Sequence, residues 1–182
     1  GEVRIIGGEW RRTKLPVALK PGLRPTPDRV RETLFNWLGQ DLTGWRCVDA
    51  FAGTGALGLE AASRGATQVV VLEQDPDLVK ALLQQVERLK ATGVQVQRGD
   101  AVAAMQRLTA GAFDLVFLDP PFDGPWFEPA LQAAVPLVPV GGWIYLEAPV
   151  AWGAEALAPL HLKLERHLKA GAVHAHLLQR TA

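Results

Sequence analysis

The sequence predicts an α/β fold built on a mostly parallel sheet, and three observations support this. From Arg46 onward, apolar segments of strand length alternate with amphipathic segments of helix length. A glycine-rich turn joins the first of these strands to the helix after it, and several strands end in acidic residues. After Pro159 the pattern changes to two strand-like segments, 160–168 and 172–179, which predict an antiparallel hairpin closing the sheet.

The N-terminal part predicts a short β-hairpin, a loop and a helix. Residues 3–15 have the composition of two short strands with a pair of glycines near the turn. Residues 16–26 are interrupted by Pro and Gly and predict an extended loop. A helix is expected from Pro27 to Leu38, because Thr26 is a good N-cap and Pro suits the first helical position.

The remaining elements alternate along the chain. Strands are expected near residues 46–51, 68–73, 94–98, 113–118 and 142–147. Helices are expected near residues 56–64, 76–91, 101–108 and 127–137. A helix thus connects each pair of consecutive strands, as a parallel sheet requires.

Length and composition indicate an ordinary globular protein. The 182 residues fit one domain, and 48% apolar with 21% charged residues excludes global disorder. No segment has the ~20 apolar residues of a membrane span or the pattern of a signal sequence, so a cytoplasmic protein is expected. Cys47 is the only cysteine, which excludes an intramolecular disulfide. Nothing in the sequence suggests more than a monomer.

The charges are unevenly distributed although the net charge is zero. Residues 1–46 contain nine Lys and Arg against five Asp and Glu, whereas the rest contains ten against fourteen. We therefore expect a single domain, 1–182, in which a basic extension, 1–45, contacts a polyanion and residues 46–182 form the core. The alternative is ordinary solvated surface charge. The candidates for RNA contact are Arg4, Arg11, Arg12, Lys14, Arg24, Arg29 and Arg31.

The glycine-rich segment, residues 48–60, predicts a ligand-binding turn between a strand and a helix. Gly53, Gly55 and Gly58 match the GxGxxG pattern, a weak signal that nicotinamide enzymes share. Small residues there let a ligand approach the backbone, and a helix start offers free N–H groups. Glu73 ends the next strand about twenty residues on, where a carboxylate can bind ribose hydroxyls.

Two further acids favour a cationic cofactor over a dinucleotide. Asp49 stands just before the glycine turn, where it would repel a pyrophosphate but suit the amino acid end of S-adenosylmethionine. Asp100 ends the third strand and is placed to accept a hydrogen bond from an adenine amino group. With Glu73 and Asp119 these acids predict a negatively charged pocket for a sulfonium compound.

The segment Asp119-Pro120-Pro121-Phe122 directly follows a buried strand, where open α/β sheets carry their chemistry. The two prolines remove two N–H donors, which leaves nearby carbonyl groups free to accept hydrogen bonds. Acceptors beside an aromatic ring suit a planar substrate with an NH₂ group, such as a nucleobase. The alternatives are that Asp119 is only a turn residue and that Phe122 is only part of the core.

These segments together resemble known methyltransferases. The class I S-adenosylmethionine-dependent methyltransferases are matched at Asp49–Gly58, Glu73, Asp100 and Asp119–Phe122. Over essentially the whole chain the sequence is similar to the RsmD family, bacterial enzymes that methylate guanine N2 of small-subunit ribosomal RNA. The segments that carry this second resemblance are Arg4–Gly8, Arg24–Thr26 and Asp28–Leu38. Thr54 is a mild departure, since the family usually has Ser there.

The resemblance implies a Rossmann-like class I methyltransferase fold, with a seven-stranded sheet, a reversed last strand and a short N-terminal hairpin and helix. It implies S-adenosylmethionine as cofactor and 16S rRNA, within an assembled 30S particle, as substrate. The expected cofactor-binding residues are Thr26, Asp49, Phe51, Ala52, Gly53, Gly55, Glu73, Gln74, Asp100, Ala101 and Asp119.

The hypothesis for catalysis places three residues on the target base. The Asp119 carboxylate and the Pro120 carbonyl accept the two N2–H bonds, which turns the nitrogen lone pair toward the methyl group. Phe122 stacks on the base after it leaves its neighbours. Arg24 and Thr26 either bind the carboxylate of the cofactor or support the site. The four histidines lack a Cys or an acid to complete a metal site, so no metal is expected.

Other functions share part of this pattern. Methyltransferases of adenine N6 or cytosine N4 in nucleic acid carry a related tetrapeptide, although the chain lacks a separate target-recognition domain. Asp119 counts against a protein glutamine methyltransferase, which more typically has Asn there. A non-catalytic RNA-binding or assembly factor with this fold, and a nicotinamide oxidoreductase, are the alternatives from other classes.

Overall fold

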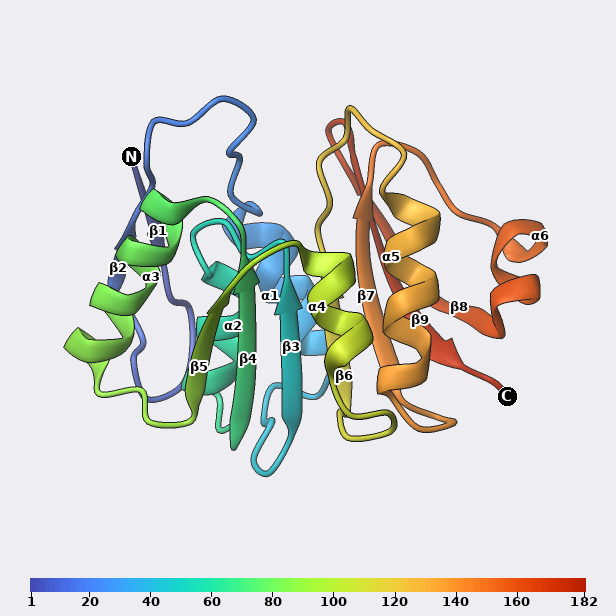
Figure 1. Cartoon of the computed structure of the whole chain (residues 1–182), viewed down its shortest axis with the longest axis horizontal. Coiled ribbons are helices and arrows are strands. Elements are labelled where there is room, and N and C mark those ends of the chain that lie inside the picture. The colour runs from blue at the N-terminus through green and yellow to red at the C-terminus, as the bar shows by residue number, and fades with distance from the viewer.

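The computed structural model describes residues 1–182 and contains a seven-stranded sheet of order β5-β4-β3-β6-β7-β9-β8 (Figure 1). The strands are β3 (Arg46–Ala50), β4 (Gln68–Glu73), β5 (Val94–Arg98), β6 (Leu115–Leu118), β7 (Trp143–Ala148), β8 (Leu162–Ala170) and β9 (Val173–Arg180). The five strands β3 to β7 pair in parallel, and β9 pairs antiparallel with both β7 and β8. Because β3 lies between β4 and β6, the strand order reverses there, and this is where open α/β sheets bind ligands.

Helices cover both faces of this sheet. They are α1 (Asp28–Trp37), α2 (Ala56–Ser63), α3 (Pro76–Leu89), α4 (Ala101–Arg107), α5 (Phe127–Ala134) and α6 (Ala154–Leu157). In Figure 1 α4 and α5 lie in front of the sheet, and α1 and α2 lie behind it. Two apolar cores result, one with α1, α2 and α3 and the other with α4, α5 and α6. Alternate residues of β6 belong to the two cores in turn, which is why this strand is apolar throughout.

The N-terminal strands β1 (Glu2–Arg4) and β2 (Lys14–Pro16) form the expected antiparallel pair. Val3, Ile5 and Leu15 are buried in the same core as α1, so this segment packs against the sheet domain. The two glycines do not make a tight turn. Gly8 lies against α2, where a Cβ atom would stand 1.9 Å from the Ser63 carbonyl oxygen.

Element boundaries differ from the predictions by a few residues. The C-terminal hairpin turns at residues 171–172, later than expected, and β6 begins at Leu115. The last turn of the helix expected over 127–137 is a 3₁₀ turn, Val135–Leu137, because Pro136 has no N–H to continue the α-helical pattern. The short elements α6 and Ala158–Leu160 have too few residues to give a periodic pattern.

The longest helix, α3, has 14 residues, and no helix combines the length and the apolar character needed to span a bilayer.

Candidate active site

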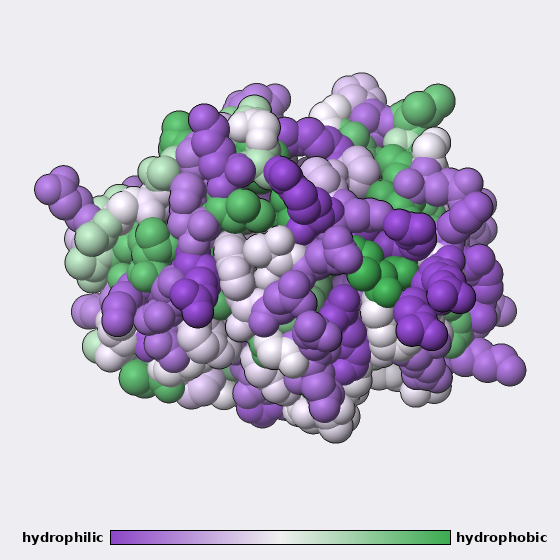
Figure 2. All heavy atoms as spheres, turned by 180° about the vertical axis from the view of Figure 1, so that it is seen from behind, coloured by the Kyte–Doolittle hydropathy of each residue, from purple (hydrophilic) through white to green (hydrophobic).

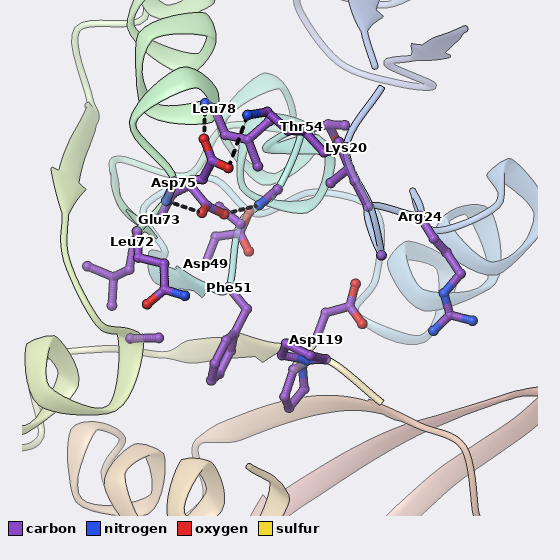
Figure 3. Close-up of a pocket in the computed structure, with 18 of the residues that line it drawn as sticks. Lys20, Arg24, Asp49, Phe51, Thr54, Leu72, Glu73, Asp75, Leu78 and Asp119 are labelled. Atoms are coloured by element: carbon purple, nitrogen blue, oxygen red, sulfur yellow. Dashed lines mark hydrogen bonds and ion pairs between the residues drawn. The ribbon is translucent and has the colours of Figure 1, made fainter. Parts of the chain in front are cut away.

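A cavity of about 530 Å³ lies at the carboxyl ends of β3, β4 and β6 and the start of α4 (Figure 3). Asp49, Phe51, Glu73 and Asp119 line it from the strand ends, and the N-terminal loop carrying Arg24 covers it. This volume is within the range of about 300–1,000 Å³ found for small-molecule sites. The site therefore lies where the topology predicts it.

Almost all of the predicted cofactor-binding residues line this cavity. They are Thr26, Asp49, Phe51, Ala52, Gly53, Glu73, Gln74, Asp100, Ala101 and Asp119. The exception is Gly55, which does not line the cavity, and its contact with a cofactor stays a prediction. Gly55 has a φ of +78° at the start of α2, and a Cβ atom there would stand 2.4 Å from the side chain of Leu82 in α3. Its lack of a side chain permits the turn and the packing of α3.

Asp49, near the end of β3, connects this strand to the helix that follows the glycine turn. Its Oδ2 atom accepts a hydrogen bond of 2.9 Å from the Gly58 N–H in α2. A Cβ atom at position 58 would stand 3.0 Å from that oxygen, so glycine allows α2 to approach the strand. Burial raises the pKa of Asp49 to about 8, although the Gly58 N–H opposes this shift. A cationic ligand beside this carboxyl group would favour its ionised form.

Glu73 and Asp100 lie on neighbouring segments of the same cavity. The Glu73 carboxylate accepts the Gly53 N–H at 2.9 Å and the Asp75 N–H at 2.8 Å, which connects the glycine turn to the start of α3. Asp100 stands after β5 and not within it. It is the N-cap of α4, and its Oδ2 atom accepts the Ala103 N–H at 2.8 Å. Its second oxygen makes no hydrogen bond within the protein, so the predicted adenine contact stays a prediction.

Glu147 in β7 belongs to this site but was not among the predicted residues. The register of β6 and β7 pairs Leu118 with Leu146, so Asp119 and Glu147 follow at equivalent positions of adjacent strands. Glu147 is only 3% exposed. Burial raises the pKa of Glu147, and burial together with the charge of Glu147 raises that of Asp119 well above its ordinary value. The signal that could have identified it is a lone acid near the carboxyl end of an apolar strand.

Thr26 does not cap α1, so this prediction is wrong. The N-cap of α1 is Pro27, which provides no side-chain hydrogen bond. The Thr26 hydroxyl group instead donates a hydrogen bond of 2.6 Å to Oε2 of Glu147, because a buried carboxylate requires a donor. Thr26 still lines the cavity, and its contact with a cofactor stays a prediction.

Arg31 does not contact RNA, so this prediction is also wrong. Its side chain is fully buried between α1 and α2, where it forms ion pairs with Glu60, at 3.1 Å, and with Asp28. It also donates to the carbonyl group of Arg4 at 2.8 Å. Position 31 falls on the helix face that carries Val30 and Leu34, and this periodicity could have indicated burial.

The other basic candidates of the extension have exposed side chains. They are Arg4, Arg11, Arg12, Lys14, Arg24 and Arg29. Arg4 forms an exposed ion pair of 3.3 Å with Asp28. The face opposite that of Figure 1 is mainly hydrophilic, with apolar side chains in small groups (Figure 2). These residues are accessible to a polyanion, and their contact with RNA stays a prediction.

Phe122 lines the cavity together with Pro120, as expected, but one face of its ring is covered. The Cζ atom of Arg24 lies 3.9 Å from the ring centroid of Phe122. Phe127 contacts the same ring at a centroid distance of 6.2 Å and an interplanar angle of 51°. A base that stacks on Phe122 would therefore meet the guanidinium group of Arg24.

Comparisons with known proteins agree over nearly the whole chain. The family model described as "Conserved hypothetical protein 95" matches residues 3–179. Ribosomal RNA small subunit methyltransferase D of Escherichia coli (strain K12) is 41% identical over 188 aligned residues, which cover 100% of this chain and 92% of that protein. The protein of the same name from Haemophilus influenzae is 42% identical, with coverages of 88% and 82%.

A solved structure of the Escherichia coli protein yhhF has a TM-score of 0.86, with 40% sequence identity and coverages of 100% and 99%. Both the sequence and the fold are thus similar from end to end. Because the family model and the full-length relatives agree, the chain belongs to the conserved hypothetical protein 95 family, the RsmD family that its motifs resemble.

Proposed function

We propose that this protein transfers a methyl group from S-adenosylmethionine to the exocyclic N2 of a guanine in small-subunit ribosomal RNA. Family membership supports the reaction and the class of RNA. The observation that carries the choice of an exocyclic amine is the segment Asp119 to Phe122, which opens into the same cavity as the glycine turn. The site for the methyl donor and the site for a planar amine thus adjoin in one cavity.

The residues that line the cavity suit S-adenosylmethionine. When bound, this compound supplies an electrophilic methyl group on a positively charged sulfur. Burial raises the pKa of Asp49, and a nearby cation would stabilise its ionised form. The ammonium group at the amino acid end of the compound is such a cation. Glu73 is placed for the ribose hydroxyls and Asp100 for the adenine amino group. Gly53 has a φ of +58°, and a Cβ atom there would stand 3.0 Å from Leu23, so glycine suits this position of the turn.

Asp119 and Pro120 perform the positioning step in this proposal. The carboxylate and the carbonyl group each accept one N2–H bond, so the lone pair of N2 points away from both acceptors and toward the methyl group. The same contacts stabilise the positive charge that develops on N2. The pKa of Asp119 is raised well above its ordinary value by burial, and such a carboxylate can hold the proton that N2 loses.

We extend the proposal to the form of the substrate and the state of the enzyme. The substrate is the assembled small subunit, and the enzyme acts on it as a monomer in the cytoplasm. The exposed basic side chains of residues 1–45 support contact with a large polyanion. Comparing transfer rates on 30S particles and on free 16S rRNA tests the form of the substrate.

The reaction is tested by incubating the enzyme with labelled S-adenosylmethionine and, separately, unmethylated 30S particles, free 16S rRNA and DNA. Nucleoside analysis should yield N2-methylguanosine from RNA only, and the Asp119→Ala variant should lose most of the transfer. N6-methyladenine or N4-methylcytosine in DNA would replace the proposal with the nearest alternative. Cofactor binding without transfer to any nucleic acid would indicate a non-catalytic factor.

A further inference from the structure

The side chain of Arg24 occupies the position that a target base needs. Its Cζ atom lies 3.9 Å from the ring centroid of Phe122, close to the spacing of two stacked planar groups. Both side chains line the cavity with Asp119. In Figure 3 the guanidinium group of Arg24 and the carboxylate of Asp119 lie on the same side of this cavity. The charge of Arg24 opposes the rise in pKa that burial imposes on Asp119.

The loop that carries Arg24 is attached at both ends. Lys20 Nζ is 2.6 Å from Oδ2 of Asp77 in α3, and the Thr26 hydroxyl group donates to Glu147 in β7. Arg24 itself takes part in none of the ion pairs and is exposed. The backbone near Arg24 is thus held while its long side chain has only the ring of Phe122 as a partner.

A guanidinium group and the edge of guanine contain the same chemical unit. In both, one carbon is bonded to three nitrogens in a plane, and guanine presents N1–H and N2–H₂ as adjacent donors. The amino groups of adenine and cytosine have a ring nitrogen acceptor beside them instead. The acceptors of this site, the Asp119 carboxylate and the Pro120 carbonyl, therefore suit the two adjacent donors of guanine.

We propose that the side chain of Arg24 occupies the place of the target guanine on Phe122 in the RNA-free enzyme and must leave this ring before the base can stack there. The guanine edge replaces the guanidinium group, which then pairs with a backbone phosphate of the displaced nucleotide. Guanine gains the acceptors Asp119 and Pro120 in addition to the ring of Phe122, and this offsets the loss of the contact between Arg24 and the ring. This inference rests on the proposed function only in naming guanine as the target.

The substitution Arg24→Ala should change two affinities in opposite directions. The affinity for free guanosine should rise several-fold because the ring of Phe122 becomes accessible, whereas the affinity for 30S particles should fall because alanine cannot pair with a phosphate. Calorimetry measures the first and filter binding the second, and neither depends on methyl transfer. Arg24→Lys keeps the charge near Asp119 but not the planar group, so its gain in guanosine affinity should be smaller.

Arg107→Ala is the matched control, since Arg107 is an exposed arginine of α4 outside the cavity. It should leave the affinity for guanosine unchanged. Equal guanosine affinity in wild type and Arg24→Ala would overturn the inference. If the wild type methylates no RNA, the proposed function fails, while the guanosine measurements still decide whether Arg24 covers Phe122.

Discussion

Three acidic side chains meet on one face of the neighbouring strands β3, β6 and β7. Asp49 and Glu147 are buried, and Asp119 lies between them at the end of β6. Burial raises the pKa of each, and their mutual repulsion adds to this effect for Asp49 and Asp119. Such clustering costs stability, and strongly perturbed carboxyl groups in a cavity are typical of functional sites.

Glu147→Gln should shift the pH dependence of methyl transfer. The negative charge of Glu147 raises the pKa of Asp119, so its removal lowers that pKa and keeps Asp119 ionised at lower pH. The acidic limb of the rate profile should move to lower pH, while the glutamine amide oxygen still accepts the Thr26 hydroxyl. Single-turnover rates across pH measure this. An unmoved limb, or an equal movement in the exposed control Glu155→Gln, would contradict the prediction.

Asp49→Asn should change how stability depends on pH. The pKa of Asp49 is about 8 in the folded protein and near 3.8 when unfolded, so the folded state binds the proton more tightly. Its contribution to stability is full below pH 3.8 and is lost as pH rises toward 8. At pH 8 the variant should therefore melt several degrees above the wild type, with a smaller difference at pH 5. Thermal denaturation at the two pH values checks this, and an equal difference at both would contradict it.

At the scale of secondary-structure elements, one carboxylate joins the N-terminal segment to the glycine turn. Glu60 of α2 accepts the Ile6 and Gly7 N–H groups at 2.8 and 2.9 Å and pairs with Arg31 of α1 and with Arg64. Because α2 begins directly after the glycine turn, these contacts fix the position of the helix that borders the cavity. Glu60 thus joins the N-terminal strands and α1 to α2, in addition to the contacts of Thr26 with β7 and of Lys20 with α3.

Glu60→Ala should destabilise the protein strongly. It leaves the buried guanidinium group of Arg31 without its main partner, and loss of one member of a buried ion pair costs about 3–5 kcal/mol. The exposed control Glu9→Ala should change stability by less than about 0.5 kcal/mol. Urea denaturation of both variants gives the two values. Similar midpoints for the two variants would show that Glu60 does not carry this connection.

At the scale of the whole molecule, charge is separated between a basic N-terminal segment and an acidic cavity beside it. The cavity attracts a cationic donor, while the exposed arginines and lysine around the extension are available to phosphates. The loop over residues 20–26 belongs to both regions, because it covers the cavity and carries Arg24. Under the proposed function, binding of RNA and access of a base to Phe122 are connected through this loop.

Replacing Arg11 and Arg12 by Glu should weaken RNA binding and its salt dependence. For each phosphate that the protein no longer neutralises, the slope of log affinity against log salt falls by about one unit. Filter binding of 30S particles at several salt concentrations measures the slope. Lys163→Ala, in β8 of the C-terminal hairpin, is an exposed control that should leave it unchanged. An unaltered slope in the double variant would exclude these two arginines from the interface.

The sequence by itself determined the order of the elements, the glycine turn after β3 and the segment from Asp119 to Phe122. These features depend on local chemistry: residue periodicity, the conformations open to glycine and the missing N–H of proline. It therefore also predicted the strand ends at which the cavity lies.

Only the tertiary structure decided which distant residues meet there. Thr26 and Glu147 are 121 positions apart and form one hydrogen bond, Arg31 is buried against Glu60, and Arg24 covers Phe122. No local pattern encodes such pairs, because each depends on how a helix or loop packs against a strand far away in the chain. Burial then sets the role of each charged side chain, since a group removed from water must find a partner within the protein.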